Sequence, residues 1–133
     1  MENNEFAIEC LDHVAILVND LEVSAKWYEK VLGLKKYQLP EWREFPIFML
    51  SGKSGIALFP AKLEKVTPDL KVDHFAFNVT NKNFERAKKK YAQLNLEFSI
   101  RDHHYFHSIY TKDPDGYTVE LTTIMVNENE FYK

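Results

Sequence analysis

The chain has 133 residues, of which 45% are apolar and 28% are charged, as expected for a soluble globular protein of one domain or two small fused units. A net charge of −3 without a long basic run disfavours nucleic acid as a partner. No apolar stretch approaches the roughly 20 residues of a membrane span, and the N-terminus is acidic rather than signal-like. Cys10 is the only cysteine, which excludes a disulfide framework, and we expect a cytoplasmic protein.

The first predicted strand, residues 11–18, is repeated at residues 72–79, so that His74 lies 61 residues after His13. Both runs are rich in β-branched and apolar residues and end in a polar turn, as strands do. After each run the apolar period changes from two to about 3.6, which predicts a helix. These helices end near Gly33 in the first copy and near Asn95 in the second, because both residue types favour the left-handed backbone that stops a helix.

Three short strand-like runs follow each helix, and the connection between the copies is expected at 61–71. The predicted strands are 35–39, 45–50 and 55–60, then 97–101, 106–111 and 117–124. Three matched stretches in the same order favour duplication over two unrelated segments. We therefore predict an α+β fold of two βαβββ modules, 7–61 and 71–125, which pack together as a single domain, 7–125, followed by a C-terminal tail, 126–133.

The two repeated histidines are candidate metal ligands. A single histidine in an apolar strand is more often a structural group, but His13 and His74 occupy the same point of equivalent strands. Each shares its strand face with a small residue, Ala15 or Ala76, which leaves space for an ion. The pair therefore favours a site that neither residue alone would indicate.

Glu120 is the candidate third ligand. Strand alternation places it on one face with Thr118 and Thr122, and an inward carboxylate would be costly without a cation. The alternative is that this face is simply wet. Two imidazoles and one carboxylate leave about three positions of an octahedral ion open, which indicates chemistry rather than structural support. Such ligands suit Fe²⁺, Mn²⁺, Zn²⁺ or Ni²⁺ and do not choose among them.

Two further stretches could contribute to a site. Residues 101–108 hold three histidines near Glu120 that could contact substrate or move protons, or could form an exposed polar hairpin. In the first copy, Trp42, Arg43, Phe45 and Phe48 are expected on strands, where one face would look into a cavity. Arg43 is either an anion contact or an exposed edge residue.

Taken together, residues 11–14 with the following helix, 72–77 and 113–121 resemble the vicinal oxygen chelate superfamily, which includes glyoxalase I, fosfomycin-resistance and bleomycin-resistance proteins and extradiol dioxygenases. The resemblance covers nearly the whole chain. It implies a mixed sheet that curls around a cavity, with His13, His74 and Glu120 as metal ligands. Glyoxalase I has a fourth ligand, and the matching residue here is expected to be Phe59, which cannot bind metal.

The residues before Glu120 are similar to the extradiol dioxygenase signature, at His103, at Tyr110 and in the turn 113–116. The resemblance gives His103 and Tyr110 catalytic roles as contacts to metal-bound substrate oxygens. It implies a metal-dependent, dioxygenase-like homodimeric enzyme acting on a small-molecule substrate chelated through adjacent oxygens. The alternatives are a metal-free drug-sequestering protein like bleomycin-resistance proteins and a lactoylglutathione lyase-like enzyme. Thiol transfer to an epoxide antibiotic would need potassium- and phosphonate-binding residues that the sequence does not identify.

Overall fold

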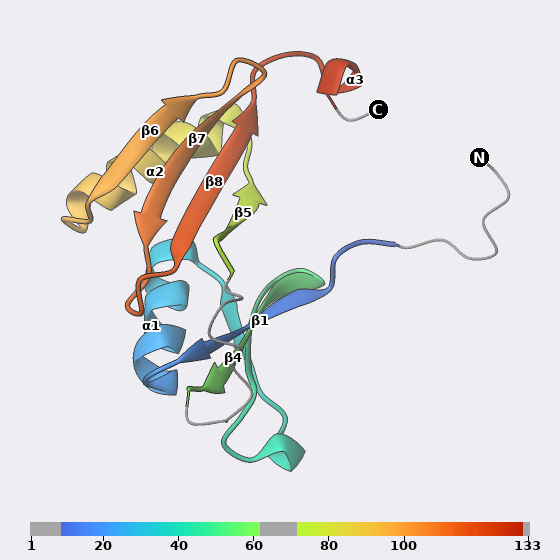
Figure 1. Ribbon diagram of the computed structural model, residues 1–133, viewed down its shortest axis with the longest axis vertical. Helices are drawn as coiled ribbons and strands as arrows, with labels where there is room; N and C mark the ends of the chain where they lie inside the picture. The colour runs from blue at the N-terminus through green and yellow to red at the C-terminus, as the bar shows by residue number, and fades with distance from the viewer. Residues whose placement is uncertain (1–8, 62–71, 132–133) are drawn as a thin grey trace, which may run out of the picture. The chain divides into compact units, whose positions relative to one another are not determined.

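The computed structural model describes residues 9–61 and 72–131, and the chain divides into two compact units along the boundary between the predicted copies (Figure 1). Each unit is described by itself. The predicted connection lies outside the described residues except for Ala61. In the part of the chain that the structure describes, no helix is long and apolar enough to cross a membrane.

The first unit has the predicted order of strand, helix and three strands. Its elements are β1 (His13–Val18), α1 (Leu21–Leu32), β2 (Lys35–Tyr37), the 3₁₀ helix η1 (Pro40–Trp42), β3 (Ile47–Ser51) and β4 (Ser54–Pro60). The sheet order is β1-β4-β3-β2, with β1 and β4 parallel and the other pairs antiparallel.

The second unit repeats this arrangement. Its elements are β5 (His74–Asn78), α2 (Asn81–Gln93), β6 (Phe98–Asp102), β7 (Phe106–Lys112), β8 (Thr118–Ile124) and the one-turn helix α3 (Glu128–Phe131). The sheet order is β5-β8-β7-β6, again with one parallel pair, between β5 and β8. The α+β class and the two βαβββ units are therefore confirmed, with a separate four-stranded sheet in each unit. Within the predicted tail, α3 adds a short helix.

Local signals at the helix ends explain where each helix begins and stops. The Asp20 carboxylate accepts hydrogen bonds from the backbone N–H groups of Glu22 and Val23 at the start of α1. Gly33, at φ 70°, ends α1 in the left-handed region. Thr80 caps the start of α2. At its end Leu94 is the C-cap residue, and Asn95, at φ 58°, adopts the left-handed conformation one residue later. Both predicted stop signals are confirmed.

Each unit buries one face of its sheet against its helix. In the first unit, α1 contacts β3 and β4, and the buried side chains are Ile16, Val18, Ala25, Tyr28, Val31, Ile47, Met49, Ile56 and Leu58. In the second, α2 lies along one face of its sheet (Figure 1), where Tyr91 packs against Phe98 and Phe84 lies beside His107. In each unit the repeated histidine, His13 or His74, lies on the sheet face that points away from the helix of that unit.

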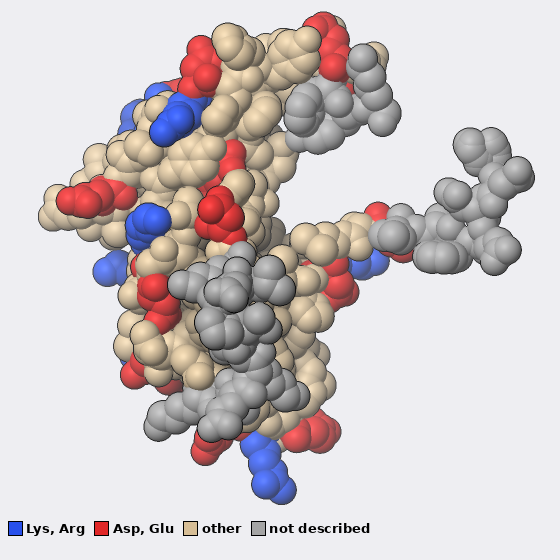
Figure 2. Space-filling model, in the orientation of Figure 1, with Lys and Arg blue, Asp and Glu red and all other residues tan. Residues whose placement is uncertain are grey.

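Charged side chains are interspersed with uncharged ones on the face drawn in Figure 2, and the described residues visible there form no continuous basic stripe. A polyanion-binding surface requires such a stripe.

The buried hydroxyl of Tyr91 in the second unit leads to a testable prediction about stability. The Tyr91 hydroxyl is buried without a hydrogen-bond partner among the described residues, and burial raises its pKa to about 12. Removing it in Tyr91→Phe should raise the free energy of unfolding at pH 7 by about 1 kcal/mol, because an unsatisfied polar group leaves the core. The folded-state pKa lies above the ordinary value of 10.0, so wild-type protein should lose stability as the pH rises from 10 through 12.

Urea unfolding of both proteins at pH 7 and pH 11 checks this expectation. The stability gained by Tyr91→Phe should be larger at pH 11 than at pH 7. The same difference at both pH values would contradict the assignment of alkaline destabilisation to Tyr91.

Candidate metal centre

The parallel pairing of β5 with β8 brings His74 and Glu120 together. Ala76 is the register partner of Glu120, and His74 lies two residues earlier on the same strand face. The His74 Nε2 atom is 3.3 Å from Glu120 Oε1. Glu120 is only 5% exposed, whereas the His74 side chain is 43% exposed. The predicted inward carboxylate is therefore buried, and the alternative of a wet strand face does not hold at Glu120.

Each repeated histidine is oriented by the aspartate that precedes it. His74 Nδ1 lies 2.7 Å from Asp73 Oδ2, and His13 Nδ1 lies 2.8 Å from Asp12 Oδ1. A carboxylate that accepts a hydrogen bond from Nδ1–H leaves the lone pair of Nε2 for a metal ion and makes Nε2 a better ligand. The Asp-His repeat in the sequence thus corresponds to the same hydrogen bond in both units.

Ser108, on β7, holds the second oxygen of Glu120. Its Oγ–H donates to Glu120 Oε2 at 2.5 Å, and Ser108 is fully buried. This bond partly satisfies the buried carboxylate and fixes its orientation, so that Oε1 faces His74. Sequence reasoning missed Ser108. Its alternation with Tyr110 on β7 was the available signal.

Tyr110 lies directly across from Glu120, as the register partner on β7. Burial raises the pKa of the Tyr110 hydroxyl, and the Glu120 charge raises it further. The Tyr110 hydroxyl lies 2.9 Å from His103 Nε2. The structure therefore brings both predicted catalytic residues together beside the carboxylate.

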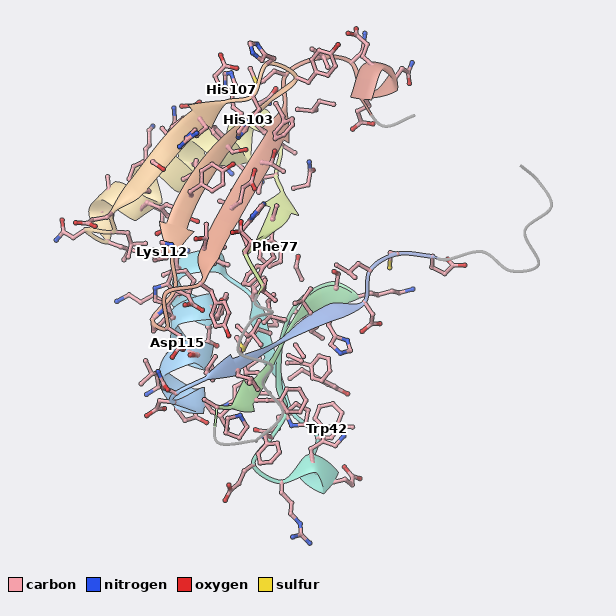
Figure 3. All side chains as sticks on the ribbon, in the orientation of Figure 1. Trp42, Phe77, His103, His107, Lys112 and Asp115 are labelled. Atoms are coloured by element: carbon pink, nitrogen blue, oxygen red, sulfur yellow. The ribbon has the colours of Figure 1, made fainter. Side chains whose placement is uncertain are left out.

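The other two histidines of the hairpin lie elsewhere. His107 lies on the α2 side of the sheet, beside Phe84, with its Nε2 3.5 Å from Asp102 Oδ1. His104 is exposed, and its backbone has φ 73°. Figure 3 shows His103 and His107 at one end of β7, with Lys112 and Asp115 toward the other. Only His103 of the three is hydrogen-bonded to a residue next to Glu120.

The turn before β8 is built as the sequence predicts. The Asp113 carboxylate accepts from the backbone N–H groups of Asp115 and Tyr117, both at 2.9 Å, and Gly116 has φ 90°. This turn leads directly into the strand that carries Glu120 and so sets its register.

The expectation that Phe59 matches Glu120 is wrong. In the first unit Ala15 pairs with Ala57, as Ala76 pairs with Glu120 in the second, so the matching residue is Ala57. The offset of 61 residues between the copies pairs Gly55 with Gly116, but Gly55 lies in β4 and Gly116 in the turn before β8, so this offset does not hold for the last strand of each unit. Ala57 has no ligating group either, so the first unit still offers no fourth ligand at this position.

Across residues 9–61 and 72–131, no three or more histidine, cysteine or acidic side chains gather closely enough to hold an ion. The second unit brings together His74 and Glu120, and His13 belongs to the first unit. The donor atoms are imidazole Nε2 atoms, whose rings contact an aspartate through Nδ1, and one oxygen of the buried Glu120 carboxylate. Donors of these kinds suit a divalent ion. Completion of the set by His13 stays a prediction.

Comparison with known proteins identifies the family to which this fold belongs. Residues 10–121 match the family model of the Glyoxalase/Bleomycin resistance protein/Dioxygenase superfamily, and the chain belongs to this superfamily.

Particular relatives show its breadth. The chain is 31% identical to the metallothiol transferase FosB of Lysinibacillus sphaericus, over 95% of this chain and 91% of that protein. It is 32% identical to Glyoxylase I 4 of Arabidopsis thaliana, over 89% of this chain and 72% of that one. Among solved structures, the fosfomycin resistance protein FosX of Mesorhizobium loti superposes with a TM-score of 0.66 and 26% identity, covering 93% and 99% of the two chains.

Proposed function

We propose that this chain is a divalent-metal-dependent enzyme that acts on a small molecule bound through two adjacent oxygens, with His13, His74 and Glu120 as the metal ligands. The main support for this proposal is the buried Glu120 carboxylate. One of its oxygens accepts a hydrogen bond from Ser108, and the other faces His74 Nε2. A buried carboxylate is costly unless a cation or hydrogen bonds compensate it, and an ion at His74 would supply the missing charge.

The residues around Glu120 fit this role. A bound ion would act as a Lewis acid toward the substrate oxygens. Tyr110 presents a protonated hydroxyl beside the carboxylate, and its bond to His103 offers a path for a proton between phenol and imidazole. His103 and Tyr110 are therefore the proposed acid–base pair, acting on an oxygen of the bound substrate.

Two reaction classes have support. The spacing of His103, Tyr110 and Glu120 favours dioxygenase-like chemistry, and the contact of His103 with Tyr110, the register partner of Glu120, supports it. Thiol transfer is favoured by the 31% identity to a metallothiol transferase. A lactoylglutathione lyase-like enzyme is less well supported, because Ala57 replaces a fourth ligand. The metal-free drug-sequestering protein does not explain the orienting Asp-His pairs.

The first experiment is elemental analysis of protein purified without added metal, for wild type and His74→Ala. Near-stoichiometric divalent metal in wild type only is the expected result. Substoichiometric metal in both, even after incubation with Fe²⁺, Mn²⁺, Zn²⁺ or Ni²⁺, would refute the proposal. Oxygen uptake with catechol on the Fe²⁺-loaded protein, against thiol consumption with an epoxide, then separates the two reaction classes.

The orienting aspartates give a matched prediction. Asp73→Asn keeps the shape of the side chain but removes the negative partner of His74 Nδ1, so metal affinity should fall about 10–100-fold. Asp20→Asn, at the start of α1, is the control, because asparagine caps a helix about as well as aspartate and Asp20 does not contact either histidine of the repeat. Titration calorimetry with Zn²⁺ measures both. Equal affinity in Asp73→Asn and wild type would show that Asp73 does not orient a ligand.

We further propose that the protein is a homodimer. In that case His13 joins Glu120 of its own chain or of a partner. Mixing His13→Ala with Glu120→Gln protein distinguishes the two arrangements, since only a site shared between chains regains metal binding in the mixture.

A further inference from the structure

The sheet face of the first unit that carries His13 is lined by aromatic rings. The Phe48 ring meets the His13 ring edge-on at a centroid distance of 4.9 Å, and Trp42 lies 5.3 Å from Phe48. Tyr37, the register partner of Phe48, lies 6.3 Å from Trp42 and is 51% exposed. Trp42 and Phe48 are half-buried. Tyr37, Trp42 and Phe48 form the aromatic surface of the first unit.

Trp42 reaches this surface from the 3₁₀ helix η1, beyond the end of β2 (Figure 3). The aromatic surface therefore extends from the candidate ligand His13, across β3, to the loop that follows β2. A ring contact with His13 itself distinguishes it from an apolar patch that happens to lie on the same unit.

The matching face of the second unit is polar. Across the last two strands, Phe48 and Ala57 pair in the first unit, and Tyr110 and Glu120 pair at the same point of the second. One strand further out, Tyr37 pairs with Phe48 in the first unit, and Ser99 pairs with Tyr110 in the second. The two copies thus present the same backbone positions with different chemistry. One copy supplies a carboxylate, hydroxyls and a histidine, and the other supplies rings and a histidine.

We propose that the aromatic surface binds an aromatic ring of the substrate, and that the substrate class is small molecules in which a ring is attached directly to the group whose two adjacent oxygens chelate the ion. This inference rests on the proposed function. Because the Phe48 ring touches the His13 ring, a molecule chelated at an ion on His13 places its adjoining atoms within reach of Phe48 and then of Trp42. Ring pairs at such distances attract beyond the apolar area that they bury.

A pair of simple chelators tests this directly on the full chain loaded with Zn²⁺. Acetohydroxamate and benzohydroxamate bind metals through the same two adjacent oxygens and differ in a methyl against a phenyl group. Benzohydroxamate should bind about 10–100-fold more tightly, the gain expected for burying a phenyl group. Trp42→Ala should reduce this ratio to about threefold or less, since it removes the largest ring of the aromatic surface.

Trp27→Phe is the matched control. Trp27 lies on α1, where its ring packs against Tyr28, and it should keep the wild-type ratio. Equal binding of the two hydroxamates by wild-type protein would overturn the inference and leave the proposed function standing. So would a wild-type ratio in Trp42→Ala, or benzohydroxamate binding that is equally tight without metal. Failure of both hydroxamates to bind the Zn²⁺-loaded protein would overturn the proposed function and this inference with it.

Discussion

Glu120→Gln is expected to lower the affinity for a divalent ion by more than about 100-fold, beyond the range that changes in outer-shell partners produce. The amide keeps the shape of the side chain but loses the charged oxygen that faces His74 Nε2. Metal-free Glu120→Gln should be at least as stable as metal-free wild type, because the variant no longer buries a carboxylate. Titration calorimetry and thermal melts with and without chelator measure the two effects.

The matched control is Glu97→Gln, the same change at an exposed residue just before β6. It should leave both metal affinity and stability unchanged. If Glu120→Gln retained wild-type metal affinity, the carboxylate would not be a ligand, and the proposed function would lose its main support. If it instead lost stability strongly without metal, the bond from Ser108 would be the dominant role of Glu120.

Gly55→Ala is expected to destabilise the protein by about 3 kcal/mol or more, at the upper end of the cost of overpacking. A Cβ atom at Gly55 would overlap the backbone carbonyl oxygen of Met49 and lie 2.9 Å from the Leu50 Cα atom. Neither atom can move without separating β3 from β4. Because Gly55 is also the register partner of His13, the same change should disturb the strand that carries this candidate ligand.

Gly52→Ala provides the comparison, in the turn between β3 and β4. A Cβ there would meet no atom within 4 Å, and only its φ of 63° opposes the change, at about 1–2 kcal/mol. Urea unfolding of both variants tests the ranking. A Gly55→Ala protein as stable as Gly52→Ala would show that the β3–β4 pairing relaxes more easily than the close backbone approach indicates.

Much of the fold could be predicted from the sequence because the duplication displays each signal twice. The Asp-His runs, the change of apolar period and the stop signals at Gly33 and Asn95 depend on local backbone preferences, and all correspond to the observed elements. The inward position of Glu120 also followed from strand alternation. The roles of His103 and Tyr110 came from the family resemblance, and their hydrogen bond emerged only from the structure.

Most features that the sequence did not reveal depend on the register in which strands pair, which short-range sequence patterns do not encode. Phe59 was matched to Glu120 because two glycines align, whereas the strand pairing shows Ala57 there. The alternation of Ser108 with Tyr110 is visible in the sequence, but it points to Glu120 only once the pairing of β7 with β8 is known. Trp42 was expected on a strand and lies in a 3₁₀ helix, which the sequence Leu39-Pro40 could have indicated, since proline favours the first turn of a helix.

The division of the proposed ligands between the two units has a thermodynamic consequence. His13 is encoded in one half of the chain and His74 and Glu120 in the other, so an ion held by all three makes the unfolding of each half depend on the other. At an ion concentration 100 times the dissociation constant, this linkage amounts to about 2.7 kcal/mol. Chelation would then act as a reversible cross-link. It would also give natural selection a reason to keep two copies on one polypeptide after the side chains on their matching sheet faces had diverged.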